Sequence, residues 1–176
     1  MGDTVICLGL YGDVETADRE FEALKALGLN KHIALHDAAV VMRKEDGSVE
    51  VSERTKQHGA AGGAMVGAAV GLFMIVLPPV GLAAVAAGAG AGAVAGDVGL
   101  HLTRGLSEHQ AKELGSFLGK GEVSLIAVTD EESSATVLDA MGSALEAISH
   151  TSKVSKETLE QAVDEARLAG GGAQGS

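Results

Sequence analysis

The sequence predicts an α+β fold: a ferredoxin-like β-α-β-β-α-β domain, interrupted by a glycine-zipper α-helical hairpin and followed by a C-terminal α-β-α extension. Two observations predict it. Outside residues 59–96, short β-rich runs and amphipathic helical stretches follow one another in that order along the chain. Between the third strand and the second helix lies Gly59–Gly96, a segment without a charged side chain. We call this segment the apolar block.

These patterns divide the chain into four parts. Residues 1–58 are predicted to form the first half of the α+β domain, and residues 59–96 the helical hairpin. Residues 97–169 supply the second half of the domain and the C-terminal helices. Residues 170–176 are rich in glycine, and we expect them to form a flexible tail.

The first half starts with a buried strand and an amphipathic helix. Thr4–Tyr11 is mostly apolar and contains the only cysteine, Cys7, which we expect to be a small buried hydrophobe. Asp13 can cap the following helix, and Gly28 is expected to end it. The apolar side chains of this helix recur at helical spacing, at Val14, Ala17, Phe21, Leu24 and Leu27.

A β-hairpin is predicted next. Two extended runs, Ala38–Lys44 and Ser48–Arg54, flank the residues Glu45-Asp46-Gly47. An Asp-Gly pair tolerates the positive φ of a tight turn, which makes it a strong hairpin signal.

The second half begins with a potential capping box. Ser107 and Gln110 can exchange hydrogen bonds at the start of a helix that we expect to end near Gly119. The remaining predicted elements are a buried strand over 122–130, a helix over 134–145, a short strand over 147–151 and an exposed helix over 155–170.

Two prolines, Pro78 and Pro79, divide the apolar block into the arms Gly59–Leu77 and Val80–Gly96. Proline cannot continue a helix, so we expect both prolines at the tip of a helical hairpin. At 1.5 Å per residue, each arm would be about 26–28 Å long. Each arm would therefore just span the hydrocarbon core of a bilayer, which is about 30 Å thick.

Glycine recurs at every fourth residue in parts of both arms, at Gly63, Gly67, Gly71, Gly88, Gly92 and Gly96. This spacing puts the glycines of each arm on one helix face, where a second helix backbone can approach closely. In water an interior glycine costs a helix about 1 kcal/mol relative to alanine, so packing has to compensate. A hairpin in a membrane and a soluble assembly with the hairpins in its interior both provide such packing.

Charges at the ends of the apolar block predict its orientation. Arg54 and Lys56 precede it and Arg104 follows it, whereas the proline tip is uncharged. By the positive-inside tendency, both flanks should face the cytoplasm from the inner membrane. Residues 1–12 contain an acidic residue and no Lys or Arg, unlike a secretory signal. Asp97 and Arg104 are candidates for an ion pair that anchors the hairpin to the α+β domain.

Composition and motifs argue against several functions. A net charge of −11 and 2% aromatic residues are unlike a nucleic-acid-binding protein, which needs clustered Lys and Arg. With one cysteine, and with His32 and His36 four residues apart in a stretch predicted as loop and strand, we expect no metal site and instead solvated or hydrogen-bonded histidines. The glycines of Gly88–Gly96 lack the preceding strand of a dinucleotide site, so no cofactor is expected. Because no catalytic motif is present, we predict that the chain is not an enzyme.

Four stretches of the sequence resemble the bacterial domain-of-unknown-function 1269 family. They are "LHDAAVVMRKEDGSV" (Leu35–Val49), "GAAGGAMVGAAVGL" (Gly59–Leu72), "GDVGL" (Gly96–Leu100) and "KELGSFLGKGEVSLIAV" (Lys112–Val128). The resemblance runs from about Ile33 to Glu157. Members are usually described as predicted membrane proteins, so it implies a membrane location. It implies no reaction and supplies no catalytic residues.

Three functions follow from these features. The first is a membrane-associated structural protein that self-assembles through the glycine-zipper hairpin, with itself and membrane lipid as partners. The second is a soluble self-assembling ring, filament or shell with the hairpins inside. The third is a sensor of a small ligand, or an enzyme, in the ferredoxin-like domain, which would need polar residues that converge in a cleft.

Overall fold

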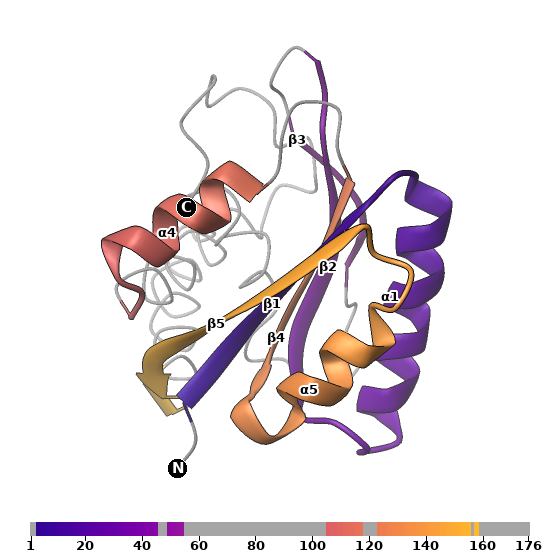
Figure 1. Cartoon of the computed structure of the whole chain (residues 1–176). Coiled ribbons are helices and arrows are strands. Elements are labelled where there is room, and N and C mark those ends of the chain that lie inside the picture. Colours follow the sequence, from indigo (N-terminus) through magenta and orange to yellow (C-terminus); the bar gives the residue numbers. More distant parts are fainter. Residues whose placement is uncertain (1–2, 46–48, 55–104, 118–122, 156, 159–176) are drawn as a thin grey trace, which may run out of the picture.

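The computed structural model describes residues 3–45, 49–54, 105–117, 123–155 and 157–158 (Figure 1). These residues form a mixed fold of one sheet and three helices, which confirms the predicted α+β class. The elements in chain order are β1 (Asp3–Tyr11), α1 (Val14–Leu29), β2 (Leu35–Arg43), β3 (Val49–Arg54), α4 (Glu108–Phe117), β4 (Val123–Asp130), α5 (Glu131–Ala140) and β5 (Glu146–Ser155).

The sheet has five strands in the order β3-β2-β4-β1-β5, and every neighbouring pair is antiparallel. In the centre of the sheet, β4 lies between β1 and β2. Its register puts Ile126 opposite Leu8 of β1 and opposite Ala39 of β2. Strands from before and after the apolar block therefore pair with one another within one sheet.

The strand order does not confirm the ferredoxin-like arrangement for the six elements to which the sequence assigns it. In that arrangement the third strand would lie between the first two, but β3 pairs only with β2 and forms one edge. The predicted C-terminal extension is also wrong in part. Its strand is β5, which pairs along nearly all of β1, and its first helix, α5, packs on the sheet.

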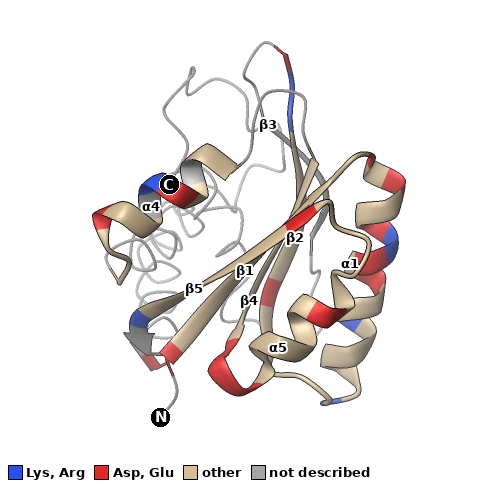
Figure 2. Ribbon diagram, viewed as in Figure 1, with Lys and Arg blue, Asp and Glu red and all other residues tan. Residues whose placement is uncertain are grey.

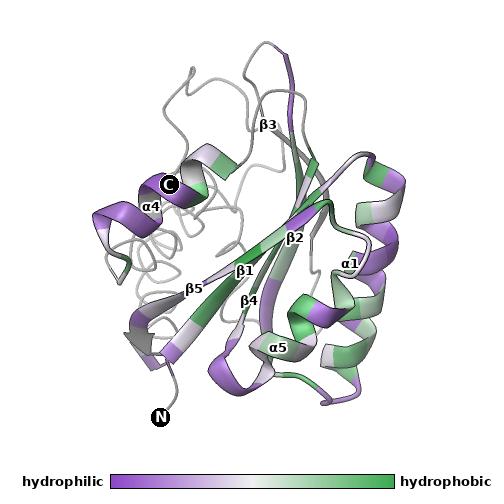
Figure 3. Ribbon diagram, viewed as in Figure 1, coloured by the Kyte–Doolittle hydropathy of each residue, from purple (hydrophilic) through white to green (hydrophobic). Residues whose placement is uncertain are grey.

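One face of the sheet is covered by α1 and α5, which lie side by side on it (Figure 1). Figure 3 shows that both helices alternate hydrophobic and hydrophilic residues, as expected for helices half-buried on a sheet. We call this side the helix-covered face. Its buried cluster comprises Val5, Cys7, Tyr11, Ala17, Phe21, Leu24, Ile33, Ala38, Val40, Val123, Leu125, Ala127, Val137 and Met141.

The predicted start of α1 is confirmed. Asp13 is the N-cap, and its Oδ1 accepts a hydrogen bond of 2.7 Å from the backbone N–H of Thr16. The predicted end at Gly28 is wrong, because the helix continues to Leu29 and the positive φ falls on Lys31. Gly28 serves another purpose: a Cβ built there would lie 3.1 Å from that of Leu35, so glycine permits the close approach of β2.

The capping box of α4 is confirmed as well. The Ser107 N–H donates to Gln110 Oε1 at 2.9 Å, and the Gln110 N–H donates to Ser107 Oγ at 3.2 Å. The helix over 134–145 instead spans Glu131–Ala140, since Asp130 already ends β4 and stands at the N-cap of α5. Of the last predicted helix, over 155–170, the structure describes Ser155, which ends β5, and residues 157–158, which are helical.

The second face of the sheet is buried as well, and it mixes apolar with polar side chains. Side chains that alternate with those of the helix-covered face point to it, and we call it the opposite face. Its buried residues are Thr4, Ile6, Leu8, Asp37, Ala39, Val41, Ser124, Ile126, Val128 and Ser152. Antiparallel sheets commonly leave one face to water, so burial on both faces is a distinctive property of this sheet.

Candidate functional site

The residues that are predicted from the sequence to mediate assembly lie outside the described residues. This holds for all six glycines of the two arms, for Pro78 and Pro79 at the tip, and for Asp97 and Arg104. Their predicted roles stay predictions. What the structure does place is the residue at each end of the undescribed stretch 55–104, namely Arg54 and Gly105.

These two residues lie at opposite edges of the sheet. Arg54 is the last residue of β3, which forms one edge, and pairs with Ala39 of β2. At the other edge, the carbonyl oxygen of Gly105 accepts a hydrogen bond of 3.1 Å from the backbone N–H of Lys153 in β5. Residues 55–104 therefore start at one edge of the sheet and return at the other.

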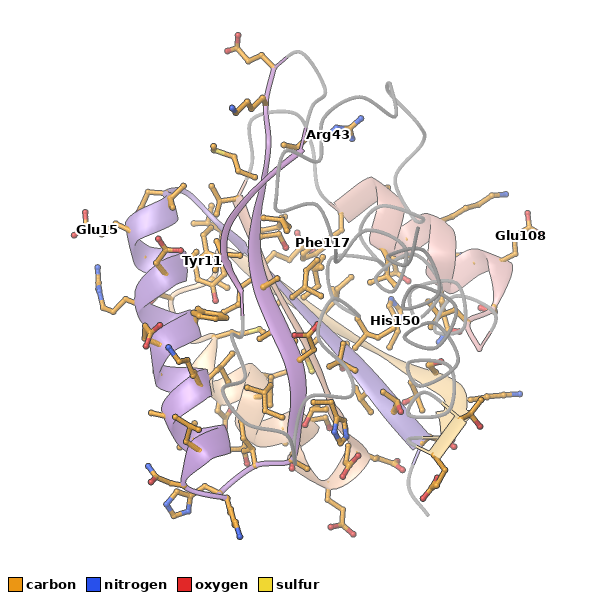
Figure 4. All side chains as sticks on the ribbon, turned by 180° about the vertical axis from the view of Figure 1, so that it is seen from behind. Tyr11, Glu15, Arg43, Glu108, Phe117 and His150 are labelled. Atoms are coloured by element: carbon orange, nitrogen blue, oxygen red, sulfur yellow. The ribbon has the colours of Figure 1, made fainter. Side chains whose placement is uncertain are left out.

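Helix α4 follows that return and lies on the opposite face, beside β5. His150 of β5 is paired with Ile6 of β1, so their side chains share this face. His150 Nε2 lies 3.4 Å from Glu113 Oε2 of α4, an ion pair whenever the histidine is protonated. Figure 4 places Phe117 and His150 between α4 and the sheet, whereas Glu108 points away from it.

A second polar group lies where β4 meets α5. His36 Nε2 and Asp130 Oδ1 are 2.5 Å apart, with the histidine side chain 8% exposed. Nearby, the Ala34 N–H donates to Ser133 Oγ and Thr129 Oγ1 donates to the Ala34 carbonyl, both at 2.9 Å. All three contacts join the residues around the start of β2 to the end of β4 and the start of α5.

This group is better explained as a structural tie than as a catalytic site. A carboxylate can orient a histidine for proton transfer, but catalysis also needs a nucleophile or substrate at the other ring nitrogen. Ser133 is engaged with the backbone of Ala34. Among the described residues, no group of His, Cys, Asp and Glu side chains could hold a metal ion.

Tyr11 forms a third polar contact, at the end of β1. Its hydroxyl donates a 2.6 Å hydrogen bond to Glu20 Oε2 of α1, and Glu20 Oε1 accepts from the Ser143 N–H at 2.8 Å. Burial raises the pKa of Tyr11, and the hydrogen bond to the Glu20 carboxylate raises it further. One carboxylate thus joins β1, α1 and the connection between α5 and β5.

Cys7 is confirmed as a buried hydrophobe of the helix-covered face. It has no exposed surface, and burial raises the pKa of its thiol to about 12. A thiolate is the reactive form of cysteine, so this residue is inert near neutral pH. The sequence alone indicated this role from the apolar run around Cys7.

Charges on the described surface are mostly acidic (Figure 2). Acidic side chains occupy the first turns of all three helices: Glu15 in α1, Glu108 in α4, and Glu131 and Glu132 in α5. These positions favour negative charge because of the helix dipole. These four acidic residues therefore stabilise the first turns of the helices.

Sequence reasoning missed the partners of the two paired histidines. Asp130 is far from His36 along the chain, and Glu113 is far from His150. Neither pair has a local sequence signal. The described part of the chain contains no helix with the length and hydropathy needed to cross a bilayer.

Comparison with known proteins gives one match. The model of a family described as "Protein of unknown function (DUF1269)" matches residues 60–168. This range includes the apolar block, α4, β4, α5 and β5. Neither the curated proteins nor the solved structures contain a match to this chain.

Proposed function

The chain belongs to the DUF1269 family, and we propose that it is a non-enzymatic structural protein of the membrane. In this proposal the apolar block forms a glycine-zipper helical hairpin in the bilayer. The five-stranded sheet is the water-exposed domain that the hairpin carries. The hairpins of several copies associate, and the sheet domain faces the cytoplasm from the inner membrane.

The observation that carries the proposal is that an uncharged segment starts and ends on one folded domain. Gly59–Gly96 contains no Asp, Glu, Lys, Arg or His. The residues before and after it, Arg54 and Gly105, both belong to the sheet domain. A single crossing would put these two ends on opposite sides of a membrane. A hairpin returns the chain to the side from which it started, as two helices joined at Pro78 and Pro79 would do.

Self-association is supported by the composition of the two arms. In lipid there is no hydrophobic driving force between helices, so they associate through close packing at small residues. The glycines at four-residue spacing provide such a stripe on each arm. Net charge of the chain is −11, so the sheet domains offer no basic surface for anionic lipid, and the hairpin itself must provide the attachment.

We also infer that the ferredoxin-like arrangement holds for a different set of elements. In a split β-α-β arrangement, two parallel strands joined by a helix flank a third strand. Here β1, α1 and β2 flank β4, and α5 leads from β4 to β5 beside β1. The insertion would then consist of β3, the apolar block and α4. The strand order β5-β1-β4-β2 and the position of α1 and α5 on one face support this assignment.

Fractionation of cells that produce the full chain tests the membrane location. We expect the protein in the membrane pellet, retained after a sodium carbonate wash and released by detergent. Complete release by carbonate would contradict membrane insertion. A single large species in size-exclusion chromatography without detergent would instead favour a soluble assembly with the hairpins inside.

Glycine substitutions test the self-association. Gly67→Leu and Gly92→Leu would each fill the stripe of one arm, so we expect both to lower the oligomeric size in detergent. Ala69→Leu is the matched control, because two residues along a helix is nearly the opposite face from Gly67. If both glycine variants assemble like the control, the glycine-zipper interpretation is wrong.

A further inference from the structure

The centre of the opposite face carries an apolar patch, with the buried polar residues Thr4, Asp37, Ser124 and Ser152 on the same face. Across its centre, Ala39 of β2, Ile126 of β4 and Leu8 of β1 lie side by side in register. The next row along the strands places Val128 beside Ile6. All five side chains are buried, and none exceeds 4% exposure. An apolar surface of this kind is stable in water only when another apolar group covers it.

The elements that the structure describes do not supply that cover. Helices α1 and α5 pack on the helix-covered face. Helix α4 lies on the opposite face beside the edge strand β5, where Glu113 contacts His150, and Gly105, which precedes the helix, is bonded to Lys153 of the same strand. The central strands β2, β4 and β1 therefore need a further covering segment on this face.

The course of the chain points to one segment. Residues 55–104 leave the sheet at the β3 edge and re-enter it at the β5 edge, just before α4 on the opposite face. At about 4.8 Å between neighbouring strands, the distance from β3 to β5 is about 19 Å. Helical arms of about 26–28 Å are long enough to lie across all five strands.

The chemistry of the two surfaces agrees with this course. The apolar block has no charge that would be left unpaired against the sheet. It consists largely of alanine and glycine, with Met65, Phe73 and Ile75 among the few large side chains. A helix with small residues on one face can approach a sheet of Ala, Val and Ile closely.

We propose that, in the absence of a membrane, the apolar block of the same chain docks on the opposite face of its own sheet. This inference goes beyond the proposed function, because it says where the block lies before lipid takes it up. The apolar block then has two positions. In water it is docked on the opposite face of the sheet, and in the presence of a bilayer it leaves that face and inserts into the lipid. The two proposals can fail independently of each other.

Cysteine cross-linking of the full chain in buffer without lipid or detergent tests the docking. In a Cys7→Ala background, Ala39→Cys is combined in turn with cysteines at Ala61, Ala68, Ala83 and Ala91, and a flexible bismaleimide is added. We expect cross-links within single chains for at least one position in each arm, on denaturing gels and by mass spectrometry. Val41→Cys replaces Ala39→Cys if the latter does not fold.

The matched control is Ala23→Cys. Ala23 lies exposed on α1, and α1 packs on the helix-covered face, so this residue is on the other side of the sheet from the proposed docking surface. With the same four partners it should give no cross-link within a chain. Cross-links found only between chains would show that a second copy covers the face, and would overturn the proposal. The absence of any cross-link would also overturn the proposal. This holds if the Ala39→Cys thiol reacts with maleimide, and it holds equally if another partner protects that thiol.

The fractionation experiment separates this proposal from the proposed function. Cross-linking in buffer together with release from membranes by carbonate would leave the docking in place and contradict the membrane role. Retention in membranes without any cross-link in buffer would support the membrane role and contradict the docking.

Discussion

The two faces of the sheet differ in what covers them, although the strands are buried on both faces. Described residues cover the helix-covered face, because Phe21 and Leu24 of α1 and Val137 of α5 pack against its strands. The opposite face mixes apolar side chains with buried polar ones, and Thr4 Oγ1 lacks a hydrogen-bond partner among the described residues. The comparison teaches that continuous apolar strands in an antiparallel sheet require a second cover.

The largest expected effect comes from truncating neighbouring residues of β4. Leu125 belongs to the helix-covered face and Ile126 to the opposite face, and both are fully buried. In lipid-free buffer we expect Leu125→Ala and Ile126→Ala each to lower the free energy of unfolding by about 2–5 kcal/mol, as for other buried truncations. Urea denaturation followed by circular dichroism measures both.

The same pair sharpens the comparison in detergent micelles. If micelles take up the apolar block, the penalty of Ile126→Ala should fall, because its cover has left, and that of Leu125→Ala should persist. A cost below about 1 kcal/mol for Ile126→Ala in buffer would mean that the opposite face is bare, since a residue that stays exposed loses little on truncation.

An intermediate effect is expected at the rim of the helix-covered face. Tyr11→Phe removes the hydroxyl that donates to Glu20 and should cost about 1.5–3 kcal/mol, the usual range for a hydrogen bond to a charged group. Glu22→Gln is the control, because Glu22 pairs with the partly exposed Lys25 and should change stability by less than about 1 kcal/mol. Equal effects in urea denaturation would refute a role for the Tyr11–Glu20 contact in joining β1 to α1.

The smallest effect concerns the start of α1 and appears as a pH dependence. The Thr16 N–H and hydroxyl hold the pKa of Asp13 below its usual value of 3.8. The charged form is therefore favoured in the folded state, so its contribution is present above that value and lost as the pH falls through the lowered pKa. Asp13→Asn keeps a capping side chain but removes its charge. Between pH 5 and pH 2.5 this variant should therefore lose less stability than the native chain does. Urea denaturation midpoints of the two proteins at each pH measure the difference.

Local features of the fold were predictable because they depend on neighbours in the chain. The Asp13 cap, the capping box of Ser107 and Gln110, and the buried face of α1 each rest on residues within a few positions of one another. The same holds for the hairpin of β2 and β3, whose strands are joined by an Asp-Gly turn signal. The family was also recognisable, because its motifs include the unusual composition of the apolar block.

Only the tertiary structure decided which strands are neighbours and which helices share a face. The sequence order suggested β3 as a central strand and α4 as the second packing helix, but β4 and α5 take those places. The His36–Asp130 and His150–Glu113 pairs could not be predicted from the sequence either. Strand pairing and side-chain contacts between distant segments are set by how all apolar surfaces can be buried at once, and no local pattern contains that information.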